Sequence, residues 1–576
     1  MIQRQRLFLG LVALVVLIIA ARLVYLQVYK VDFFKQKSQG QLKRIIKLYP
    51  NRGSILDRHM KPLAVTKPSY QVYAVPKSIE NKWVFAKQVA PILNKKRKTV
   101  SDTLYATKSP FLWLKRHATE AEMQALKALK LSGLGFIKTE KRFYPNNDIA
   151  SHIMGFVGVD NQGLSGLEYH YDKKLKGSPG KLIIDGDPRG RQLVSGKKQM
   201  IPKNDGHTIV TTIDTSIQFM AQEALAKAVQ KHKADAGQVI IMDPKTGDIL
   251  AMAVVPTYNA NEWKKSNSGD RRIRPVTDVF EPGSIFKIMT LASVLEEDIV
   301  SPKTTLHVPE TYTLYNKTIK EAHGRDPDES STKTVSEIIE KSLNVGTTLL
   351  AIKLGEERFY KYIKEFGFGE KTGIELAGES KGLLRPVKTW SGVDIGMISF
   401  GQGIAVTGLQ MVTAVGAIAN NGVRVKPRIV QYVMNKEGST RRSVPIQEKT
   451  RIISESTAYK VKKTLMKVVE RGTAQNLKLK QYTLAGKTGT AQKPKANGRG
   501  YEPGKYIASF VGFFPVDDPK IVMLVAIDSP RKGYYGSTVA GPVFKECAEF
   551  ILDHYNIPPD RMQHKKQLGF SKINAF

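Results

Sequence analysis

A serine and a lysine three residues apart stand at the start of an apolar stretch of this sequence. Ser284 and Lys287 lie in EPGSIFKIM, residues 281–289, and the residues that follow are almost all apolar. Residues three apart share one face of a helix, and a helix that is apolar on all sides is buried. Burial favours the neutral amine of a lysine. A neutral amine within reach of a hydroxyl can remove its proton, so the pair is a candidate nucleophile and base.

Two neighbouring residues suit that chemistry. Pro282 is compatible with the first turn of a helix, and Gly283 lets another part of the chain approach closely. The first turn of a helix also offers free N–H groups to a developing negative charge. However, a lysine on an apolar helix often extends its charged end to solvent. Serine and lysine at this spacing are therefore a weak indication when taken alone.

A second pair, Ser342 and Asn344, lies in KSLNVGTT, residues 341–348. These residues interrupt two helical patterns, so we expect a loop that presents a hydroxyl and an amide. Such a loop can hold the amine of a lysine and relay a proton. Ordinary helix capping is the alternative, because serine and asparagine are both favoured at that position.

The triplet Lys-Thr-Gly occurs three times, and its position along the chain distinguishes the copies. Residues 245–247 lie where a hairpin turn is expected, and residues 371–373 lie in a glycine-rich loop. Only residues 487–489 follow both of the other motifs and continue a strand-like run, residues 482–491. Small residues in this run let another backbone approach. We therefore expect the third copy to be the functional one.

An edge of that strand can pair with an extended peptide. Lys487 would supply a cation to the carboxylate of such a peptide, while Thr488 and Thr490 would supply hydroxyls. The third motif is therefore a candidate binding site for a substrate carboxylate.

The elements that must position these motifs follow from the periodicity of the chain after residue 206. We expect strands at 207–213, 507–515 and 520–528. Residues 237–255 predict two further strands, joined by a turn at 243–247. Helices are expected at 214–229, capped by Asp214, and at 542–554. Strands at both ends with helices between them predict an α+β domain, in which helices pack on one antiparallel sheet.

Before residue 205, short strand patterns alternate with helix patterns. Residues 69–75, SYQVYAV, predict a strand, and residues 120–129 predict a helix. Turn-forming residues gather at 177–180 and 185–190. The pattern of predicted strands and helices changes near residue 205, which indicates a domain boundary.

The N-terminus is apolar from residue 7 to residue 21 and continues to Leu26 after an interruption at Arg22. This is about the length of one membrane span. We expect a short cytoplasmic tail, residues 1–6, and a transmembrane anchor, residues 7–28. A cleavable signal peptide is the alternative, but its apolar part would be shorter and no clear small-residue cleavage site follows. No second span is indicated.

Charge and cysteine content narrow the function further. The formal net charge of the 576-residue chain is +37, and its basic residues are spread along the chain. No nucleic-acid-binding motif accompanies them, so we expect no nucleic-acid partner. A solvated surface is the simplest interpretation, and attraction to anionic lipid or an anionic polymer is its functional form. One cysteine, Cys547, allows no intramolecular disulfide.

The three motifs in this order are the set found in penicillin-binding proteins and β-lactamases. The resemblance is carried by RPVTDVFEPGSIFK (274–287), FGQG (400–403), GKTGTAQK (486–493) and KYIASFVGFFP (505–515), which are similar to the transpeptidase domain of class B penicillin-binding proteins. RGSILDRHMKPLA (52–64) and GLSGLEYHYDKKLKG (163–177) resemble the pedestal domain of that family. Met60 departs from the family pattern, which usually has glycine there.

The resemblance implies a pedestal, or dimerisation-type, domain at 29–205, a transpeptidase domain at 206–556 with helices on both faces of an antiparallel sheet, and a basic tail at 557–576. The pedestal follows the single transmembrane helix, and the catalytic domain is expected on the extracytoplasmic side of the plasma membrane.

The resemblance also implies a role for each motif residue. Ser284 would attack the carbonyl between the two D-alanines of a peptidoglycan stem peptide, and Lys287 would be the base. Ser342 would relay a proton to the leaving amine, and Asn344 would hold Lys287 and the substrate amide. The remaining implied groups are the backbone N–H groups of Ser284 and Thr490 as oxyanion hole, and Lys487, Thr488, Gly489 and Thr490 as the carboxylate site. No metal or cofactor is implied.

Within class B, KRFYPN (141–146), TDVFEPGS (277–284) and GYYGSTVAGPVF (533–544) look most like the division-specific, FtsI-type enzyme. That type works with nascent or lipid-linked peptidoglycan, with a polytopic FtsW-type glycosyltransferase as partner, and is inhibited covalently by β-lactams. An elongation-type transpeptidase is the main alternative. A penicillin-sensing protein and a β-lactamase are weaker ones, since no metalloprotease motif and no glutamate-centred deacylation loop is present.

Overall fold

The computed structural model describes residues 2–34, 43–185, 198–322, 324, 330–435, 441–446, 449–495 and 500–561. The contacts between residues divide the chain into two compact units. One unit comprises residues 1–51 and 176–206, and the other comprises residues 52–175 and 207–576. The three sequence motifs all belong to the second unit.

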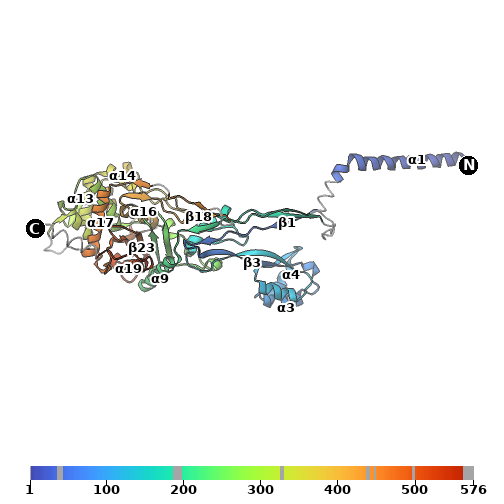
Figure 1. Cartoon of the computed structure of the whole chain (residues 1–576), viewed down its shortest axis with the longest axis horizontal. Coiled ribbons are helices and arrows are strands. Elements are labelled where there is room, and N and C mark those ends of the chain that lie inside the picture. The colour runs from blue at the N-terminus through green and yellow to red at the C-terminus, as the bar shows by residue number, and fades with distance from the viewer. Residues whose placement is uncertain are drawn as a thin grey trace. The chain divides into compact units, whose positions relative to one another are not determined.

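The first unit begins with a long apolar helix (Figure 1). α1, Ile2–Val24, continues into a π-helical turn, Tyr25–Tyr29, and among the described residues this is the one helix long and apolar enough to cross a membrane. The same unit contains an antiparallel sheet of β1 (Lys43–Leu48), β6 (Gly180–Asp185) and β7 (Lys198–Ile201), in the order β1-β6-β7. The turn predicted at 185–190 lies, apart from Asp185, outside the described residues.

A five-stranded antiparallel sheet forms the centre of the second unit, in the order β10-β9-β23-β22-β21. Its strands are β9 (Ala236–Met242), β10 (Ile249–Val255), β21 (Ala485–Pro494), β22 (Tyr501–Phe514) and β23 (Ile521–Asp528). The strands predicted within 237–255, at 507–515 and at 520–528 are confirmed. β9 is buried along its whole length, as expected of a strand covered on both faces.

Helices cover both faces of this sheet (Figure 1). A Cβ at Gly237 would meet α9 (Thr215–His232), whereas Ile240 lies against Gly408, the first residue of α16 (Gly408–Ala419). Positions 237 and 240 point to opposite faces of the strand. α9 and α16 therefore lie on opposite sides of the sheet. α19 (Gly541–His554) packs beside α9, so both predicted helices are confirmed.

The predicted cap of α9 is confirmed as well. Asp214 Oδ1 accepts hydrogen bonds from the backbone N–H groups of Ser216 (3.0 Å) and Ile217 (3.3 Å). Asp214 Oδ2 lies 3.0 Å from His59 Nε2 and 3.2 Å from His554 Nε2. One carboxylate thus joins the start of α9 to the chain near residue 59 and to the end of α19.

The strand predicted at 207–213 belongs to a different sheet from the one expected. β8 (Thr208–Thr211) pairs in parallel with β2 (Ile55–Leu56) and antiparallel with β18 (Val430–Met434). The same seven-stranded sheet contains β19 (Arg441–Ser443), β3 (Pro62–Ala74), β4 (Leu112–Ala118) and β5 (Leu134–Phe143). The periodicity of a single strand does not reveal which sheet it joins, and β2 is too short to show a pattern.

Residues 69–75 lie in β3 apart from Val75, and residues 120–128 form α5 (Glu120–Ala128), as predicted. α5, α3 (Lys82–Ile92) and α4 (Arg97–Ala106) enclose a separate small core with β3 and β4, which includes Val72, Phe85, Val89, Leu104 and Leu126. The main core of the unit surrounds the five-stranded sheet.

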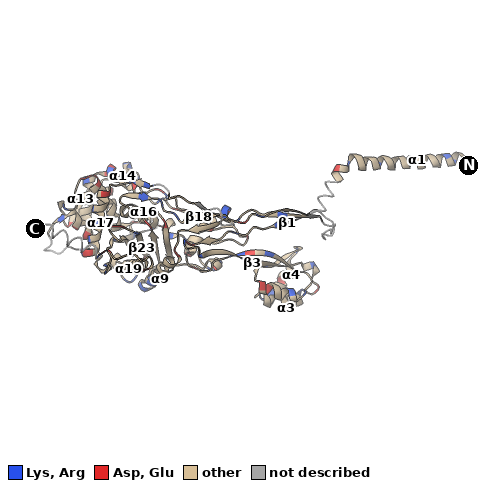
Figure 2. Cartoon of the chain, in the orientation of Figure 1, with Lys and Arg blue, Asp and Glu red and all other residues tan. Residues whose placement is uncertain are grey.

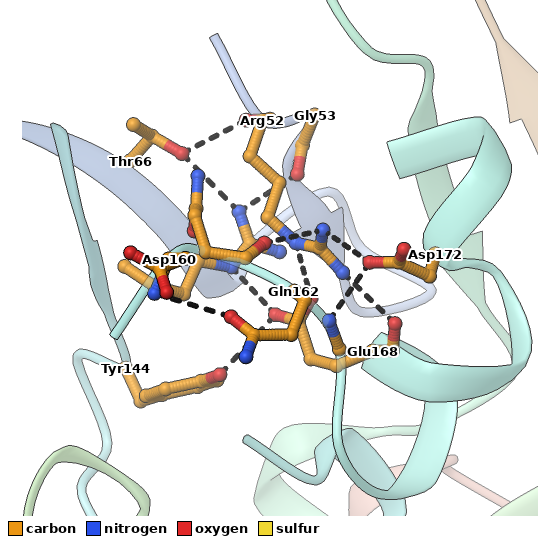
Figure 3. A network of polar contacts seen from close by, with 11 residues as sticks. Arg52, Gly53, Thr66, Tyr144, Asp160, Gln162, Glu168 and Asp172 are labelled. Carbon is orange, nitrogen blue, oxygen red and sulfur yellow. Dashed lines mark hydrogen bonds and ion pairs between the residues drawn. The ribbon is translucent and has the colours of Figure 1, made fainter. Parts of the chain in front are cut away.

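Arg52, at the start of the RGSILDR segment, belongs to a buried ion-pair network. In this network it lies close to Tyr144, Glu168 and Asp172 (Figure 3). Glu168 is fully buried on α7 (Gly166–His170) and binds Arg52 Nε at 2.7 Å through one oxygen and Arg142 Nε at 2.5 Å through the other. Arg52 also donates to Asp172 at 2.7 Å. Because each buried charge is paired, the network can be stable in a dry environment.

Met60 adopts a backbone conformation that favours glycine. Its φ is 65°, within a turn in which its N–H donates to the carbonyl of Asp57. The side chain is exposed. The departure from the family pattern therefore keeps the turn and places a residue with a Cβ in the left-handed region, which is strained.

The start of the predicted basic tail is attached to the domain. Asp560 Oδ1 accepts a hydrogen bond of 2.7 Å from Thr483 N, and Arg561 Nε donates to Tyr482 O at 2.7 Å. Residues 562–576 lie outside the described residues. Lys and Arg residues occur on many elements and do not gather on one of them (Figure 2), in keeping with their spread along the sequence.

Candidate active site

Ser284 and Lys287 lie on consecutive helical segments. A 3₁₀ turn, Gly283–Phe286, contains Ser284, and α11, Lys287–Glu296, follows it directly. In a 3₁₀ turn, residues three apart are eclipsed, so the two side chains share a face more closely than in the α-helix that the sequence suggested. Gly283 has a φ of 57°, and a Cβ there would lie 3.1 Å from Ala491 Cβ on β21. This close approach brings the serine to the edge strand of the sheet.

Lys287 is fully buried and makes specific contacts rather than reaching solvent. Its Nζ donates to the backbone carbonyl of Ser342 at 2.6 Å and to Asn344 Oδ1 at 2.7 Å. Burial lowers the pKa of Lys287 to about 7, against an opposing effect of the negative charge of Glu321. A neutral amine has two N–H donors, and both partners are acceptors, so its lone pair remains available to take a proton.

Ser284 is half-buried, and its Oγ makes no hydrogen bond to Lys287 Nζ, although both residues are in the described part of the chain. Catalytic hydrogen bonds are often long before substrate binds and tighten in the complex. The serine lines a cleft of about 520 Å³ together with Asn344 and Thr490. The predicted nucleophile is therefore accessible from the cleft.

The predicted interruption between two helices is confirmed. α12 (Val335–Glu340) ends before Ser342, and α13 (Asn344–Leu354) begins at Asn344. Ser342 has a φ of 59°, a left-handed conformation that is uncommon for serine and is often found at functional sites. In that conformation its carbonyl and its hydroxyl both point to Lys287 Nζ, the hydroxyl at 3.3 Å.

Lys487 lies on β21 and is also fully buried. Its Nζ donates to Ser342 Oγ at 2.8 Å and to the carbonyl of Thr488 at 3.3 Å. Burial, and to a smaller extent the neighbouring Lys287, hold the pKa of Lys487 well below its usual value. The hydroxyl of Ser342 thus lies between two buried amines, as a proton relay requires.

The rest of the third motif lines the edge of the sheet. Thr488 Oγ1 lies 3.1 Å from Thr473 Oγ1, and Thr490 Oγ1 accepts a hydrogen bond of 3.2 Å from Gly536 N. A Cβ at Gly489 would lie 2.4 Å from Ser509 Oγ and 3.2 Å from Pro282 O. A side chain at this position would crowd both the neighbouring strand and the turn that leads to the serine, so glycine lets the strand pack closely against that turn.

The other two Lys-Thr-Gly triplets lie elsewhere. Lys245 is in the β9–β10 turn and forms an ion pair of 2.5 Å with Asp518 at the surface. Thr372 N and Gly373 N donate to the carboxylate of Glu379, which closes a loop. Neither triplet lines the cleft of Ser284. The geometry thus brings together Ser284, Lys287, Ser342, Asn344 and the residues of the third triplet.

Two groups at the site were not expected from the sequence. Tyr501, Tyr506, Tyr534 and Tyr535 line one end of the cleft, and the rings of Tyr506 and Tyr534 are stacked at 4.9 Å. Glu281 accepts hydrogen bonds from Tyr501 (2.9 Å) and Gly403 N (2.9 Å), and its burial raises its pKa. Tyr501 and Tyr506 lie in β22, whereas Tyr534 and Tyr535 follow β23, and the spacing within each segment does not show that they meet at one cleft.

One group of described residues presents atoms close enough to hold a metal ion. A nitrogen of His59, a nitrogen of His554 and an oxygen of Asp214 lie within 4.8 Å of one another. The same oxygen already accepts hydrogen bonds from these imidazoles and from Tyr555. The other oxygen of this carboxylate, Oδ1, caps the positive end of the α9 dipole, which disfavours a cation. Hydrogen bonding accounts for the arrangement, and none of the three residues lines the cleft of Ser284.

A half-buried serine beside a buried lysine amine, next to a closely packed glycine on the edge strand of a sheet covered by helices, is the arrangement of a serine acyl-transferase of the penicillin-recognising type. The penicillin binding protein transpeptidase domain matches residues 237–549, and the penicillin-binding protein dimerisation domain matches residues 47–211. The chain belongs to the penicillin-binding protein transpeptidase family, with the domain composition of class B.

Similar proteins agree with that assignment. Stage V sporulation protein D of Bacillus subtilis is 34% identical, over 98% of this chain and 88% of that protein. Peptidoglycan D,D-transpeptidase FtsI of Escherichia coli is 31% identical, over 97% of this chain and 93% of that protein. The crystal structure of penicillin binding protein 3 of Mycobacterium tuberculosis with ampicillin matches with a TM-score of 0.70 and 29% identity, over 90% of this chain and 98% of that chain.

Proposed function

We propose that this protein is a peptidoglycan D,D-transpeptidase that cross-links stem peptides through an acyl-enzyme on Ser284. The observation that carries the proposal is the environment of Lys287, whose buried amine binds the Ser342 carbonyl at 2.6 Å and Asn344 Oδ1 at 2.7 Å. Those contacts orient a neutral amine one turn from the serine hydroxyl. Membership of the family supplies the substrate class, a peptide that ends in D-Ala-D-Ala.

In the first half-reaction, Ser284 Oγ attacks the carbonyl of the penultimate D-alanine and its proton passes to Lys287. The backbone N–H groups of Ser284 and Thr490 would stabilise the developing oxyanion. When the C–N bond breaks, the terminal D-alanine leaves as an amine, which takes its proton through Ser342. Lys487, Thr488 and Thr490 would bind the terminal carboxylate before it leaves, along the backbone of Gly489.

In the second half-reaction, an amine of a neighbouring stem peptide attacks the ester on Ser284. The acceptor amine loses a proton to Lys287, which passes it to the serine oxygen as the ester C–O bond breaks, and the new amide is the cross-link. Attack by water on the same ester would instead give D,D-carboxypeptidase activity. A β-lactam forms the same ester but retains its leaving amine, which makes it a covalent inhibitor.

The cellular location and the role of the protein are inferred from its N-terminal helix and from the similar proteins. We infer a single-pass anchor in the plasma membrane, with the catalytic domain on the extracytoplasmic side. The likeness to FtsI supports a role at the division septum with a polytopic FtsW-type glycosyltransferase as partner. Elongation of the side wall is the competing role. Imaging of a fluorescent fusion distinguishes them, because a division enzyme gathers at midcell.

The chemistry is tested by mass spectrometry after treatment with benzylpenicillin. The expected result is one penicilloyl adduct, on the peptide that contains Ser284, and no adduct in the Ser284→Ala variant. Cys547 is buried, so Cys547→Ser serves as a control for adventitious labelling and should be labelled like the parent. An adduct on another residue, or undiminished labelling of Ser284→Ala, contradicts the proposed nucleophile.

A further inference from the structure

A carboxylate lies at the N-terminus of the helix that begins at Asn344. β13 (Thr311–Leu314) and β14 (Lys317–Lys320) form a hairpin, and Glu321 follows it directly. Glu321 Oε2 accepts a hydrogen bond of 2.5 Å from Asn344 N, and Oε1 accepts one of 3.1 Å from Val345 N. The first N–H groups of a helix have no partner within it, and the helix dipole attracts an anion there.

The same segment fixes the side chain of Asn344. Asn344 Nδ2 donates to the backbone carbonyl of Lys320 at 2.9 Å, while Oδ1 accepts from Lys287 Nζ at 2.7 Å. Because Nδ2 must face a carbonyl oxygen, the amide cannot flip without losing both bonds. The end of β14 thus holds the backbone of Asn344 through Glu321 and its side chain through Lys320.

We propose that Glu321 is a positioning residue for acylation of Ser284: it holds the first turn of α13 so that Asn344 presents its oxygen to Lys287, and its charge acts on the protonation of that lysine. This inference rests on the proposed function for its catalytic consequence. Glu321 does not line the cleft that contains Ser284, so it acts through Asn344 and through its electric field rather than on the substrate.

The charged groups around Lys287 determine how readily it loses its proton. Burial lowers the pKa of Lys287, and Glu321 raises it in opposition. Among the described residues, Lys487 on β21 also lies beside Lys287. The groups that Lys287 contacts from the loop and from α13, Ser342 and Asn344, do not titrate. Glu321 lines a second cavity, distinct from the cleft of Ser284, together with Glu340, Lys341 and Arg471, and Glu340 and Arg471 are paired at 2.7 Å. Loss of the Glu321 charge should therefore lower the pKa of Lys287 further.

Removal of the Glu321 charge should change the pH dependence of the acylation rate. Acylation needs the neutral amine, so its rate should rise with pH as Lys287 loses its proton. If the pKa of Lys287 is lowered, this rise occurs at lower pH. Glu321→Gln keeps an oxygen acceptor and removes the charge, whereas Glu321→Ala removes both.

The experiment measures the second-order rate of acylation of the full-length protein in detergent, with a chromogenic β-lactam, between pH 5.5 and 9. For Glu321→Gln we expect the acid limb to move to lower pH, so that the variant keeps a larger fraction of its maximal rate at pH 6 than the parent does. For Glu321→Ala we expect the same shift and a maximal rate lower by roughly tenfold to a hundredfold, because small displacements of catalytic groups have effects of that order.

Glu337→Gln is the matched control. Glu337 also binds backbone at a helix start, since it accepts a hydrogen bond of 2.8 Å from Thr334 N at the beginning of α12, and its hydrogen-bond partners do not include Lys287. A merely structural role for both glutamates would lower thermal stability in both variants without moving the acid limb. An acid limb that stays in place in both Glu321 variants, or that moves equally in Glu337→Gln, overturns the proposal.

Hydrogen exchange gives a readout that does not depend on acylation. Glu321→Ala should speed exchange of the amides of residues 344 and 345 at least tenfold relative to the parent and to Glu337→Gln, and unchanged exchange contradicts the positioning role. If the parent itself is not acylated on Ser284, the proposed function fails and with it the catalytic part of this inference. If the parent is acylated but the Glu321 variants behave like it, only the inference about Glu321 fails.

Discussion

The hydroxyl of Ser342 accepts a hydrogen bond of 2.8 Å from the Nζ of Lys487. On its other side, the same oxygen lies 3.3 Å from Lys287 Nζ. Both lysines are fully buried, and two buried positive charges so close together repel each other strongly. The site therefore favours states in which at least one amine is neutral, and the serine hydroxyl connects the two amines.

The rate of acylation of Lys487→Ala should fall on the order of a hundredfold or more, because the change removes both the amine that binds Ser342 and the proposed ligand of the substrate carboxylate. Lys245→Ala and Lys371→Ala change the same residue type in the other two triplets, and they should acylate at close to the parent rate. Stopped-flow measurement with a chromogenic β-lactam compares the three. Similar losses in all three variants would show that the third triplet is not the functional one.

Glu168→Gln should destabilise the second unit by roughly 3–5 kcal/mol, since removing one partner leaves Arg52 and Arg142 as buried, poorly compensated cations. Thermal unfolding of the parent and the variant measures the change. Glu502→Gln, at an exposed pair with Lys505, is the control and should have little effect. A Glu168 variant as stable as the parent would mean that the network contributes no net stability.

Met60→Gly should raise stability by about 1 kcal/mol, because a left-handed residue with a Cβ is strained by about that amount. Met60→Ala keeps the Cβ and the φ of 65°, so it should give no gain. Differential scanning calorimetry gives the unfolding midpoints of the two variants, and their comparison separates relief of backbone strain from loss of an exposed methionine side chain. Equal midpoints for glycine and alanine would contradict the strain.

The residues that the sequence singled out as a candidate site lie together in the structure, and each motif could be recognised from features close to it in the sequence. Apolar periodicity placed Lys287 on a buried helix, and the break between two helical patterns placed Ser342 in a loop. The choice among the triplets followed from strand context. These features depend on residues close in sequence, and the structure brings them together at the edge of β21.

The groups that the sequence did not predict depend on long-range packing. Glu321 follows a short hairpin and binds Asn344, which lies 23 residues later at the start of α13. Nothing near Glu321 in the sequence indicates this contact. β8 reads as a strand, but its pairing with the two-residue β2 has no periodic signature. The first turn of the helix at Ser284 is 3₁₀ rather than α and packs against β21, a contact that local propensity does not encode.

The buried neutral amine of Lys287 also has a consequence for stability. In the folded chain its pKa is about 7, below the usual value, so between about pH 7 and the usual value folding releases a proton. The unfavourable contribution to folding is complete below pH 7 and fades as pH rises toward the unfolded pKa. Lys287→Met keeps the apolar stem and removes this contribution, so its thermal midpoint at pH 7 should equal or exceed that of the parent.

The rate of acylation of Lys287→Met, measured beside that midpoint, tests the central claim most directly. Lys287→Arg is the companion variant, because arginine stays protonated in proteins and cannot accept the serine proton. If Lys287 is the base, both variants fold, and both acylate Ser284 on the order of a hundredfold or more slower than the parent at pH 8. A folded Lys287→Met protein that acylates at near the parent rate would contradict the account.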